Sequence, residues 1–333
     1  MICISTSMCG LFGLLRSPLA EDPGLASDAF VTLGMLAEER GRDSAGVALL
    51  TGRPARRVTA AHGHDDDRRS DMSHGGVRVI KGRGRFSAIW RTELLADLDR
   101  SPIAMGHTRW ATQGSPFDLL NASPLVVPNG IGAGIVATHN GDVEAGLLRR
   151  RHPRLPQAQG TTDSEPVFQL LAGCQGAATV TGLLGSLVGR AALAWVDRAR
   201  PDRVHLARAA LSPLTVAVDA EQNFYWVSNP GWLREAERHT GVRFVSAVML
   251  REGTYLQVGL APARRRTRPR VLARAGFVPT ARDWDLDDRV WTGFSAADMA
   301  RDRGTLRHRV LETPAPRPPA PGPGPRPILV PAT

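Results

Sequence analysis

Short apolar runs, each bounded by polar residues, glycine or proline, recur along the chain from residue 8 to about residue 258. Runs of this length with turn-forming residues on either side are typical of buried strands. The pattern predicts strands over residues 8–15, 45–50, 77–80, 103–110, 134–143, 191–196, 204–209, 214–218, 224–227, 242–250 and 254–258.

Four other segments carry apolar residues at three- and four-residue spacing, which is typical of a helix with one buried face. They are residues 27–40, 86–98, 163–172 and 180–188. Because strands and helices come in blocks rather than in strict alternation, the sequence predicts an α+β fold and not a doubly wound parallel sheet.

The C-terminal part of the chain has a different composition. Residues 261–270 are rich in arginine and proline, and nine of the last 21 residues are proline. Proline lacks the backbone N–H that helices and sheets need, so we expect residues 261–333 to form an Arg/Pro-rich extension that is largely disordered. Within it, residues 283–299 are compatible with one or two short helices.

Composition narrows the class of protein. With 333 residues, 42% of them apolar, the chain is long enough to bury a substantial core. Most of the formal net charge of +10 lies in residues 261–333, and Lys81 is the only lysine, so arginine has replaced lysine nearly everywhere. This preference for arginine over lysine indicates the base composition of the coding DNA rather than a surface that binds phosphate groups. No platform of basic and aromatic residues accompanies it, so we expect no nucleic-acid partner.

The sequence offers no sign of membrane insertion or export. No apolar run reaches the roughly 18 residues that a membrane-spanning helix requires. The mildly apolar N-terminus carries no basic residue before Arg16, which makes it a poor signal peptide. We therefore expect no membrane partner and a cytoplasmic location.

The cysteines point to a free thiol rather than to a disulfide framework. Cys3, Cys9 and Cys174 have no metal-ligand spacing, and their odd number leaves at least one thiol unpaired. The histidines and aspartates of residues 62–67, together with His74, suggest a metal site, but a solvated connector between two strands explains them better. We expect no metal and no other cofactor.

Polar motifs stand where the predicted strands end. They are MCGLFG at 8–13, RGRDSAG at 40–46, GHTRWATQG at 106–114, NASP at 121–124, HNG at 139–141 and TTDSE at 161–165. Together and in this order, the six motifs resemble those of the class II glutamine amidotransferases, which are N-terminal-nucleophile hydrolases. The similarity is greatest to the glutaminase domain of glucosamine-6-phosphate synthase. It implies a four-layer α/β/β/α sandwich over residues 9–260.

The resemblance also implies a covalent mechanism on glutamine. Cys9 would attack the side-chain amide and form a thioester, which divides one difficult hydrolysis into two easier steps. Its base would be its own α-amino group, so residues 1–8 would be a leader or propeptide, or translation would start at Met8. Asn140 and the backbone N–H of Gly141 would stabilise the oxyanion.

The same resemblance implies how substrate glutamine is held. Arg109 would grip the α-carboxylate through two hydrogen bonds, and Asp163 would pair with the ammonium group. Trp110 and Thr112 would lie on a loop that closes over the substrate and excludes water.

Two positions depart from the family pattern. The change at Gln113 is expected to affect loop closure or the affinity for glutamine, and the change at Ser123 is expected to affect communication with a synthase domain. Gln113 and Ser123 each stand where the most similar relatives usually have histidine. Nothing after residue 260 resembles an ammonia-using synthase domain, so the expected reaction is hydrolysis of glutamine with nitrogen supplied to a separate synthase subunit. Two alternatives stay open: a stand-alone amidohydrolase that acts on a γ-glutamyl or other amide compound, and a non-catalytic binding module if the leader persists.

Overall fold

The structure is a computed structural model that describes residues 8–51, 68–129, 132–263, 266–282, 296–297, 299–300 and 309–311. Its strands are β1 (Gly10–Leu15), β2 (Ser44–Leu50), β3 (Arg69–His74), β4 (Val77–Arg83), β5 (Ile103–Arg109), β6 (Leu125–Asn129), β7 (Gly132–Val143), β8 (Gly189–Asp197), β9 (Arg203–Arg208), β10 (Thr215–Asp219), β11 (Phe224–Val227), β12 (Phe244–Met249), β13 (Thr254–Ala263), β14 (Arg266–Gly276), β15 (Thr280–Arg282) and β16 (Arg309–Leu311). Its helices are α1 (Pro23–Ala37), α2 (Phe86–Ile89), α3 (Leu95–Arg100), α4 (Ala145–Arg151), α5 (Ser164–Ala172), α6 (Gly176–Ser186) and α7 (Gly231–His239), with short 3₁₀ turns at Thr92–Leu94 and Leu119–Asn121.

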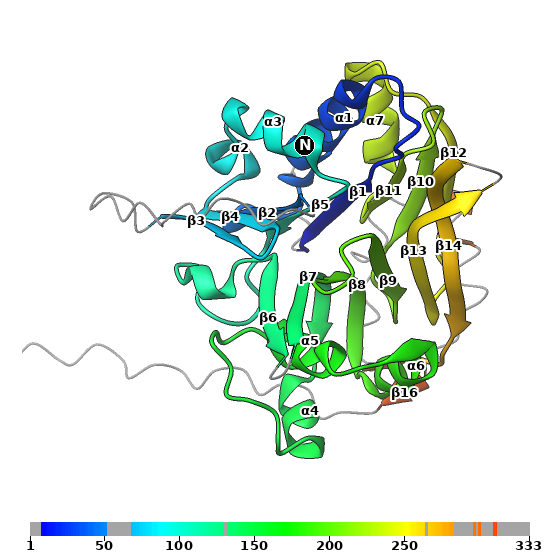
Figure 1. Ribbon diagram of the computed structural model, residues 1–333. Helices are drawn as coiled ribbons and strands as arrows, with labels where there is room; N and C mark the ends of the chain where they lie inside the picture. Colours follow the sequence, from blue (N-terminus) through cyan, green and yellow to red (C-terminus); the bar gives the residue numbers. More distant parts are fainter. Residues whose placement is uncertain are drawn as a thin grey trace, which may run out of the picture.

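Two antiparallel sheets form the body of the molecule. The first has the strand order β12-β10-β11-β1-β5-β2-β4-β3, and the second has the order β14-β13-β9-β8-β7-β6. The sheets face each other, with α1, α2, α3 and α7 outside the first and α4, α5 and α6 outside the second (Figure 1). The layers therefore run helix, sheet, sheet, helix. The predicted α+β class and the α/β/β/α sandwich are confirmed.

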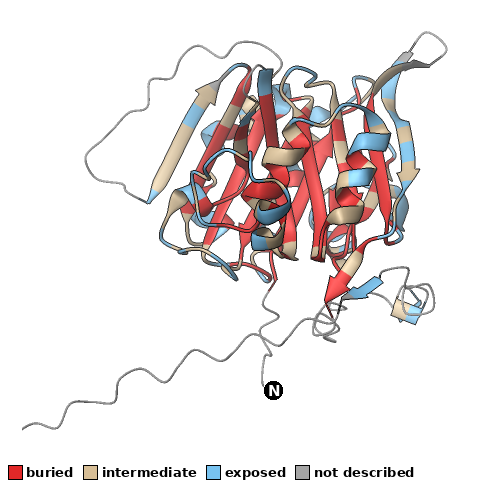
Figure 2. Ribbon diagram, turned by 90° about the horizontal axis from the view of Figure 1, so that it is seen from below, coloured by how far each residue is buried: buried red, intermediate tan, exposed pale blue. Residues whose placement is uncertain are grey.

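Side-chain alternation explains the layering, because successive residues of a strand point to opposite faces of its sheet. In β1, Phe12 and Leu14 join the core beneath α1, whereas Leu11 and Leu15 join the core between the sheets. In β8, the alternating residues divide between the inter-sheet core and a third core beneath α5 and α6. Figure 2 shows the result, with buried strands inside and helices exposed on their outer sides.

One predicted helix is divided. Residues 86–98 were expected to form a single helix, but the structure has α2, a 3₁₀ turn and α3 in their place. The chain turns extended at Trp90 and Arg91, and the ring of Trp90 stacks on Phe86 with centroids 5.6 Å apart. Packing of two aromatic rings at the helix end replaces the hydrogen bonds of a continuous helix.

The second sheet continues past the predicted domain boundary. Residue 260 lies inside β13, and β13 pairs with β14 along its whole length. β14 in turn carries four of the arginines of the expected extension and Pro269. Charge and proline are common on an edge strand, where they prevent pairing with other chains. Residues 312–333 lie outside the described residues, so the expectation of disorder there stays a prediction.

Matched glycine-to-alanine changes test the packing of the first sheet. A Cβ at Gly13 would lie 2.0 Å from Cζ2 of Trp226, whereas a Cβ at the exposed helical Gly182 meets nothing within 4 Å. We expect Gly13→Ala to lower the free energy of unfolding by about 1–3 kcal/mol through overpacking. Gly182→Ala should raise it by about 0.5–1 kcal/mol through helix propensity. Urea unfolding measures both, and equal effects would contradict the packing described here.

Candidate active site

Three strands from the two sheets meet at the site. In the first sheet, Leu11 of β1 pairs with His107 of β5. Nε2 of His107 then donates to the backbone carbonyl of His139 in β7, at 2.8 Å, and so joins the two sheets. Cys9 lies two residues before Leu11, and Asn140 directly follows His139. Burial lowers the pKa of His107 to about 3, so the imidazole is neutral and the joint carries no charge near neutral pH.

Cys9 is buried at this junction with a protonated thiol. Its Sγ donates to the carbonyl of Trp110 at 3.5 Å. Burial raises the pKa of the thiol to about 11, and the charges of Arg109 and Arg40 only partly offset this effect. Met8, directly before it, is also buried, at 5% exposure. The thiol therefore needs a base, and in the chain as numbered the nitrogen of Cys9 is an amide that cannot serve as one.

The RGRDSAG motif supplies residues that sequence reasoning did not assign to the site. Nε of Arg40 donates to the carbonyl of Cys9 at 3.1 Å, and the pKa of Arg40 is lowered to about 10 by burial. Its two Nη atoms are buried and have no hydrogen-bond partner among the described residues. Asp43 accepts a hydrogen bond from the backbone N–H of Ala111 at 2.7 Å. The motif thus holds the backbone of Cys9 and the start of the loop after Arg109; the signal for this role was its place among the six motifs.

Asn140 and Gly141, the predicted oxyanion donors, lie near the end of β7. Asn140 is 0% exposed, and neither atom of its side-chain amide has a hydrogen-bond partner among the described residues. Gly141 has φ +153°, and a Cβ there would lie 2.0 Å from the carbonyl oxygen of Arg190. A buried amide without a partner costs about 1–3 kcal/mol, so this position holds a polar group at the expense of stability.

Asp163, the residue predicted to bind the substrate ammonium, is buried, and its charge contributes to raising the pKa of the Cys9 thiol after the larger effect of burial. Oδ2 accepts from the backbone N–H of Val143 at 2.8 Å, and Oδ1 accepts from the hydroxyl of Ser164 at 3.3 Å. Burial raises the pKa of Asp163, while His139 lowers it. The carboxylate is therefore fixed by the end of β7, the strand that also carries Asn140 and Gly141.

Arg109 organises the loop that follows it, residues 110–118. Its guanidinium donates to the carbonyls of Gln113, Gly114 and Ser115 at 2.5, 3.2 and 3.2 Å. Trp110 is half-buried, and Thr112 is exposed. The structure therefore brings Cys9, Arg109, Trp110 and Asp163 together, and it places Thr112 at the outer side of the loop.

The NASP and TTDSE motifs anchor the far end of this loop. Oδ1 of Asn121 accepts from the backbone N–H of Thr161 at 2.7 Å, and Nδ2 of Asn121 donates to the carbonyl of Ser115 at 3.1 Å. Gly114 has φ +78°, and a Cβ there would lie 2.7 Å from Oγ1 of Thr161. Close contact between the two segments thus requires a glycine in the loop.

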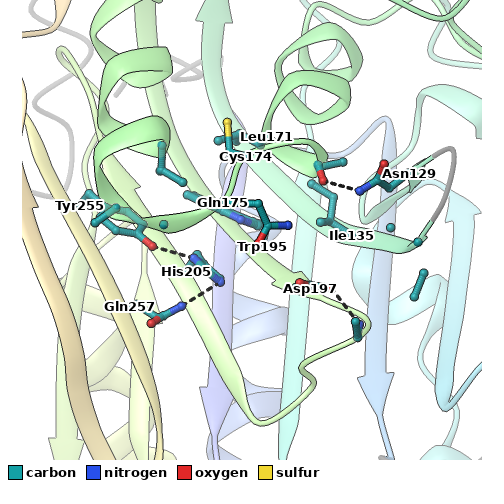
Figure 3. Close-up of a pocket in the computed structure, with 18 of the residues that line it drawn as sticks. Asn129, Ile135, Leu171, Cys174, Gln175, Trp195, Asp197, His205, Tyr255 and Gln257 are labelled. Carbon is teal, nitrogen blue, oxygen red and sulfur yellow. Dashed lines mark hydrogen bonds between the residues drawn. The ribbon is translucent and has the colours of Figure 1, made fainter.

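A separate cavity of about 200 Å³ lies on the outer face of the second sheet, beside the connection between α5 and α6 (Figure 3). His205 packs against both Trp195 and Tyr255, with ring centroids 5.0 and 6.0 Å away, and the rings of Trp195 and Tyr255 are themselves 6.0 Å apart. Nδ1 of His205 bonds the hydroxyl of Tyr255 at 2.8 Å, and its Nε2 lies 3.3 Å from Nε2 of Gln257. Cys174 lines this cavity, whereas none of the predicted site residues does.

Within the described ranges, no group of three or more His, Cys, Asp and Glu side chains is arranged to hold a metal ion. Residues 62–67, which suggested a metal site, lie outside those ranges. Likewise, none of the helices in the described part is long and apolar enough to cross a membrane.

Comparisons with known proteins agree with the motifs. No protein-family model matches the chain. The chain is 30% identical over 244 residues to glutamine–fructose-6-phosphate aminotransferase [isomerizing] of Pyrobaculum aerophilum, which is 71% of this chain and 35% of the relative. The protein of the same name from Aeropyrum pernix is 32% identical over 218 residues, 63% of this chain and 30% of the relative. The chain therefore spans about a third of the length of these curated relatives.

Solved structures share the fold. The glutamine phosphoribosylpyrophosphate amidotransferase from B. subtilis aligns with a TM-score of 0.55 at 17% identity, over 82% of this chain and 51% of that chain. A structure described as the allosteric regulatory enzyme of purine biosynthesis aligns with the same TM-score at 16% identity, over 82% and 50%. The resemblance to the class II glutamine amidotransferases and the N-terminal-nucleophile hydrolase fold are confirmed.

Proposed function

We propose that this chain, which resembles the class II glutamine amidotransferases in sequence and fold, hydrolyses the side-chain amide of glutamine to glutamate and ammonia. One observation carries the proposal: the amide of Asn140 is buried without a partner beside Gly141, on the strand that meets the strand of Cys9. Donors held in place before charge develops are what an oxyanion requires.

The reaction needs Cys9 at the start of the mature chain. With Cys9 as the first residue, through removal of residues 1–8 or through initiation at Met8 and loss of that methionine, the α-amino group takes the thiol proton and sulfur attacks the amide carbon of glutamine. The oxyanion accepts hydrogen bonds from Nδ2 of Asn140 and from the N–H of Gly141. Collapse releases ammonia, which carries the proton from the α-amine, and leaves a thioester. Water then attacks the thioester with the α-amine as base. The proton passes from the α-amine to the departing sulfur, which releases glutamate and restores the free thiol.

The electrostatics of the site support this base. The pKa of a free α-amine is about 7.7–8, which suits proton transfer near neutral pH. The buried thiol, with its pKa raised to about 11, does not ionise unaided.

Charged groups around Cys9 match the two ends of glutamine. In this proposal, Arg109 binds the α-carboxylate and Asp163 binds the ammonium group, since both lie within electrostatic range of the sulfur. Trp110 and Thr112 belong to the loop that covers the substrate. The Arg109 guanidinium already bonds three loop carbonyls, so substrate binding and loop closure share one side chain.

We propose further that the ammonia goes to a separate synthase subunit in the cytoplasm. The relatives are named as aminotransferases, and this chain spans about a third of their length. The described residues form the two-sheet sandwich and its small third sheet, β15-β16. A stand-alone amidohydrolase is the alternative, and it differs in showing no rise in activity when a synthase is added.

A cleavable fusion tests the proposal. A carrier protein is joined directly before Cys9, so that a specific protease exposes Cys9 as the first residue, and the uncleaved fusion of identical sequence is the control. We expect glutamine hydrolysis with equal amounts of glutamate and ammonia from the cleaved protein alone. If the cleaved protein is inert towards glutamine and γ-glutamyl amides alike, the function proposed here is wrong and the binding-module alternative takes its place.

A further inference from the structure

A chain of contacts links the loop over the site to a distant part of the sequence. Asp142, directly after Gly141, accepts a hydrogen bond from Nε2 of Gln113 on its Oδ1 at 2.7 Å. Its Oδ2 and its backbone carbonyl both accept from Nη2 of Arg282, each at 3.1 Å. Nη1 of Arg282 also pairs with Glu144 at 2.9 Å. Arg282 is 1% exposed, and its buried guanidinium pairs with Asp142, whose side chain is 14% exposed, and with Glu144, whose side chain is 39% exposed.

The segment that carries Arg282 is anchored at the end of the second sheet. Thr280 bridges Val188, and β15 pairs in parallel with β16. Ala281 is buried against Ala210 and Leu211. Burying a charged side chain is costly unless its partners are well placed. Arg282 has such partners in the carboxylates of Asp142 and Glu144 and in the backbone carbonyl of Asp142. The position of Arg282 is therefore set by the packing of β15, and not by the loop of residues 110–118 to which Asp142 links it.

We propose that Arg282 is a positioning residue that holds the loop of residues 110–118 over the site through Asp142 and Gln113. The inference rests on the proposed function for its catalytic meaning. Gln113 is bound twice, by Asp142 through its side chain and by Arg109 through its carbonyl. Arg282 fixes the carboxylate of Asp142, and the fixed carboxylate gives Gln113 a partner only when the loop is closed.

Closure of the loop therefore depends on β15, which contributes no group to the reaction. A hydrogen bond of this kind contributes about 1 kcal/mol, which corresponds to about a fivefold change in the closed population. Displacement of β15 removes the bond without touching Cys9, Asn140 or Asp163.

Hydrogen exchange on the cleaved protein tests the proposal without reference to activity. We expect Gln113→Ala and Arg282→Gln each to speed exchange of residues 111–118 about fivefold, and the double variant to exceed neither single one appreciably. The control Arg238→Gln removes a surface ion pair with Glu235 and should leave the loop unchanged. Loop exchange that stays at the wild-type rate in Gln113→Ala, or effects that add in the double variant, would overturn the proposal.

A charge swap covers the case in which Arg282 variants fail to fold. Gln113→Glu faces Asp142 with a like charge and should open the loop, whereas adding Asp142→Asn places an amide donor opposite the introduced carboxylate and should close it again. Where glutamine is hydrolysed, the open variants raise KM about fivefold with little change in kcat. If the double variant does not restore slow exchange, the proposed link from Arg282 through Asp142 to Gln113 is contradicted. Absence of hydrolysis with the exchange pattern intact counts only against the proposed function.

Discussion

We expect Cys9→Ala to lower glutamine hydrolysis by the cleaved protein at least about 10⁴-fold, because no other group on the site can form the thioester. The same change should abolish the single covalent adduct that 6-diazo-5-oxo-norleucine forms with the parent protein. Intact mass before and after the reagent, together with glutamate release, measures both effects. The matched control is Cys174→Ala, which removes a thiol from the separate cavity and should leave adduct and rate unchanged.

The pH dependence of the parent enzyme tests the α-amine as the base, and His107, the buried neutral imidazole that joins the two sheets, gives the contrasting profile. If the α-amine accepts the thiol proton, the rate rises with pH through about 7.7–8, because only the unprotonated amine is a base. His107, with its pKa lowered to about 3 by burial, would instead give a rate that is flat above pH 5 or so. An adduct on Cys174, or full activity in Cys9→Ala, would contradict the assignment of the nucleophile.

Asn140→Ala is expected to have a large effect on catalysis and a small effect on stability. Loss of one oxyanion donor lowers kcat about 100- to 1000-fold with little change in KM. The free energy of unfolding should not fall by the amount usual for a buried polar residue, because the amide has no partner to lose among the described residues. Removing an unpaired buried amide offsets the loss of packing, so we expect a net change within about 1 kcal/mol.

Asn121→Ala is the matched control for that result. Asn121 is equally buried, but its amide bonds Thr161 and Ser115. Its removal should cost about 2–3 kcal/mol in urea unfolding, since both hydrogen bonds are lost and the backbone N–H of Thr161 loses its acceptor, whereas the carbonyl of Ser115 keeps its bond to Arg109. A similar loss of stability in Asn140→Ala would show that its amide is structural and would remove the observation on which the proposed function rests.

Local pattern predicted the α+β class well, because strands and helices show in short segments; the family resemblance implied the four layers, and the roles of the site residues stay predictions. Apolar runs between turns locate the strands, and the motifs at their ends contain Cys9, Asn140 and Asp163. What local pattern missed depends on contacts between distant segments. Arg282 reaches Asp142 across 140 positions and belongs to no motif. β14 looked like a solvated tail because charge and proline are as common on edge strands as in disordered segments.

The burial of Met8 has a consequence for control in time. On the proposed function, each molecule becomes competent through hydrolysis of one peptide bond, and that step does not run backwards. The amount of active enzyme would then depend on how many molecules have already been cleaved, and not on the present concentration of glutamine. A cell could slow such an enzyme by restraining its loop or by degrading it, but it could not return it to the dormant form.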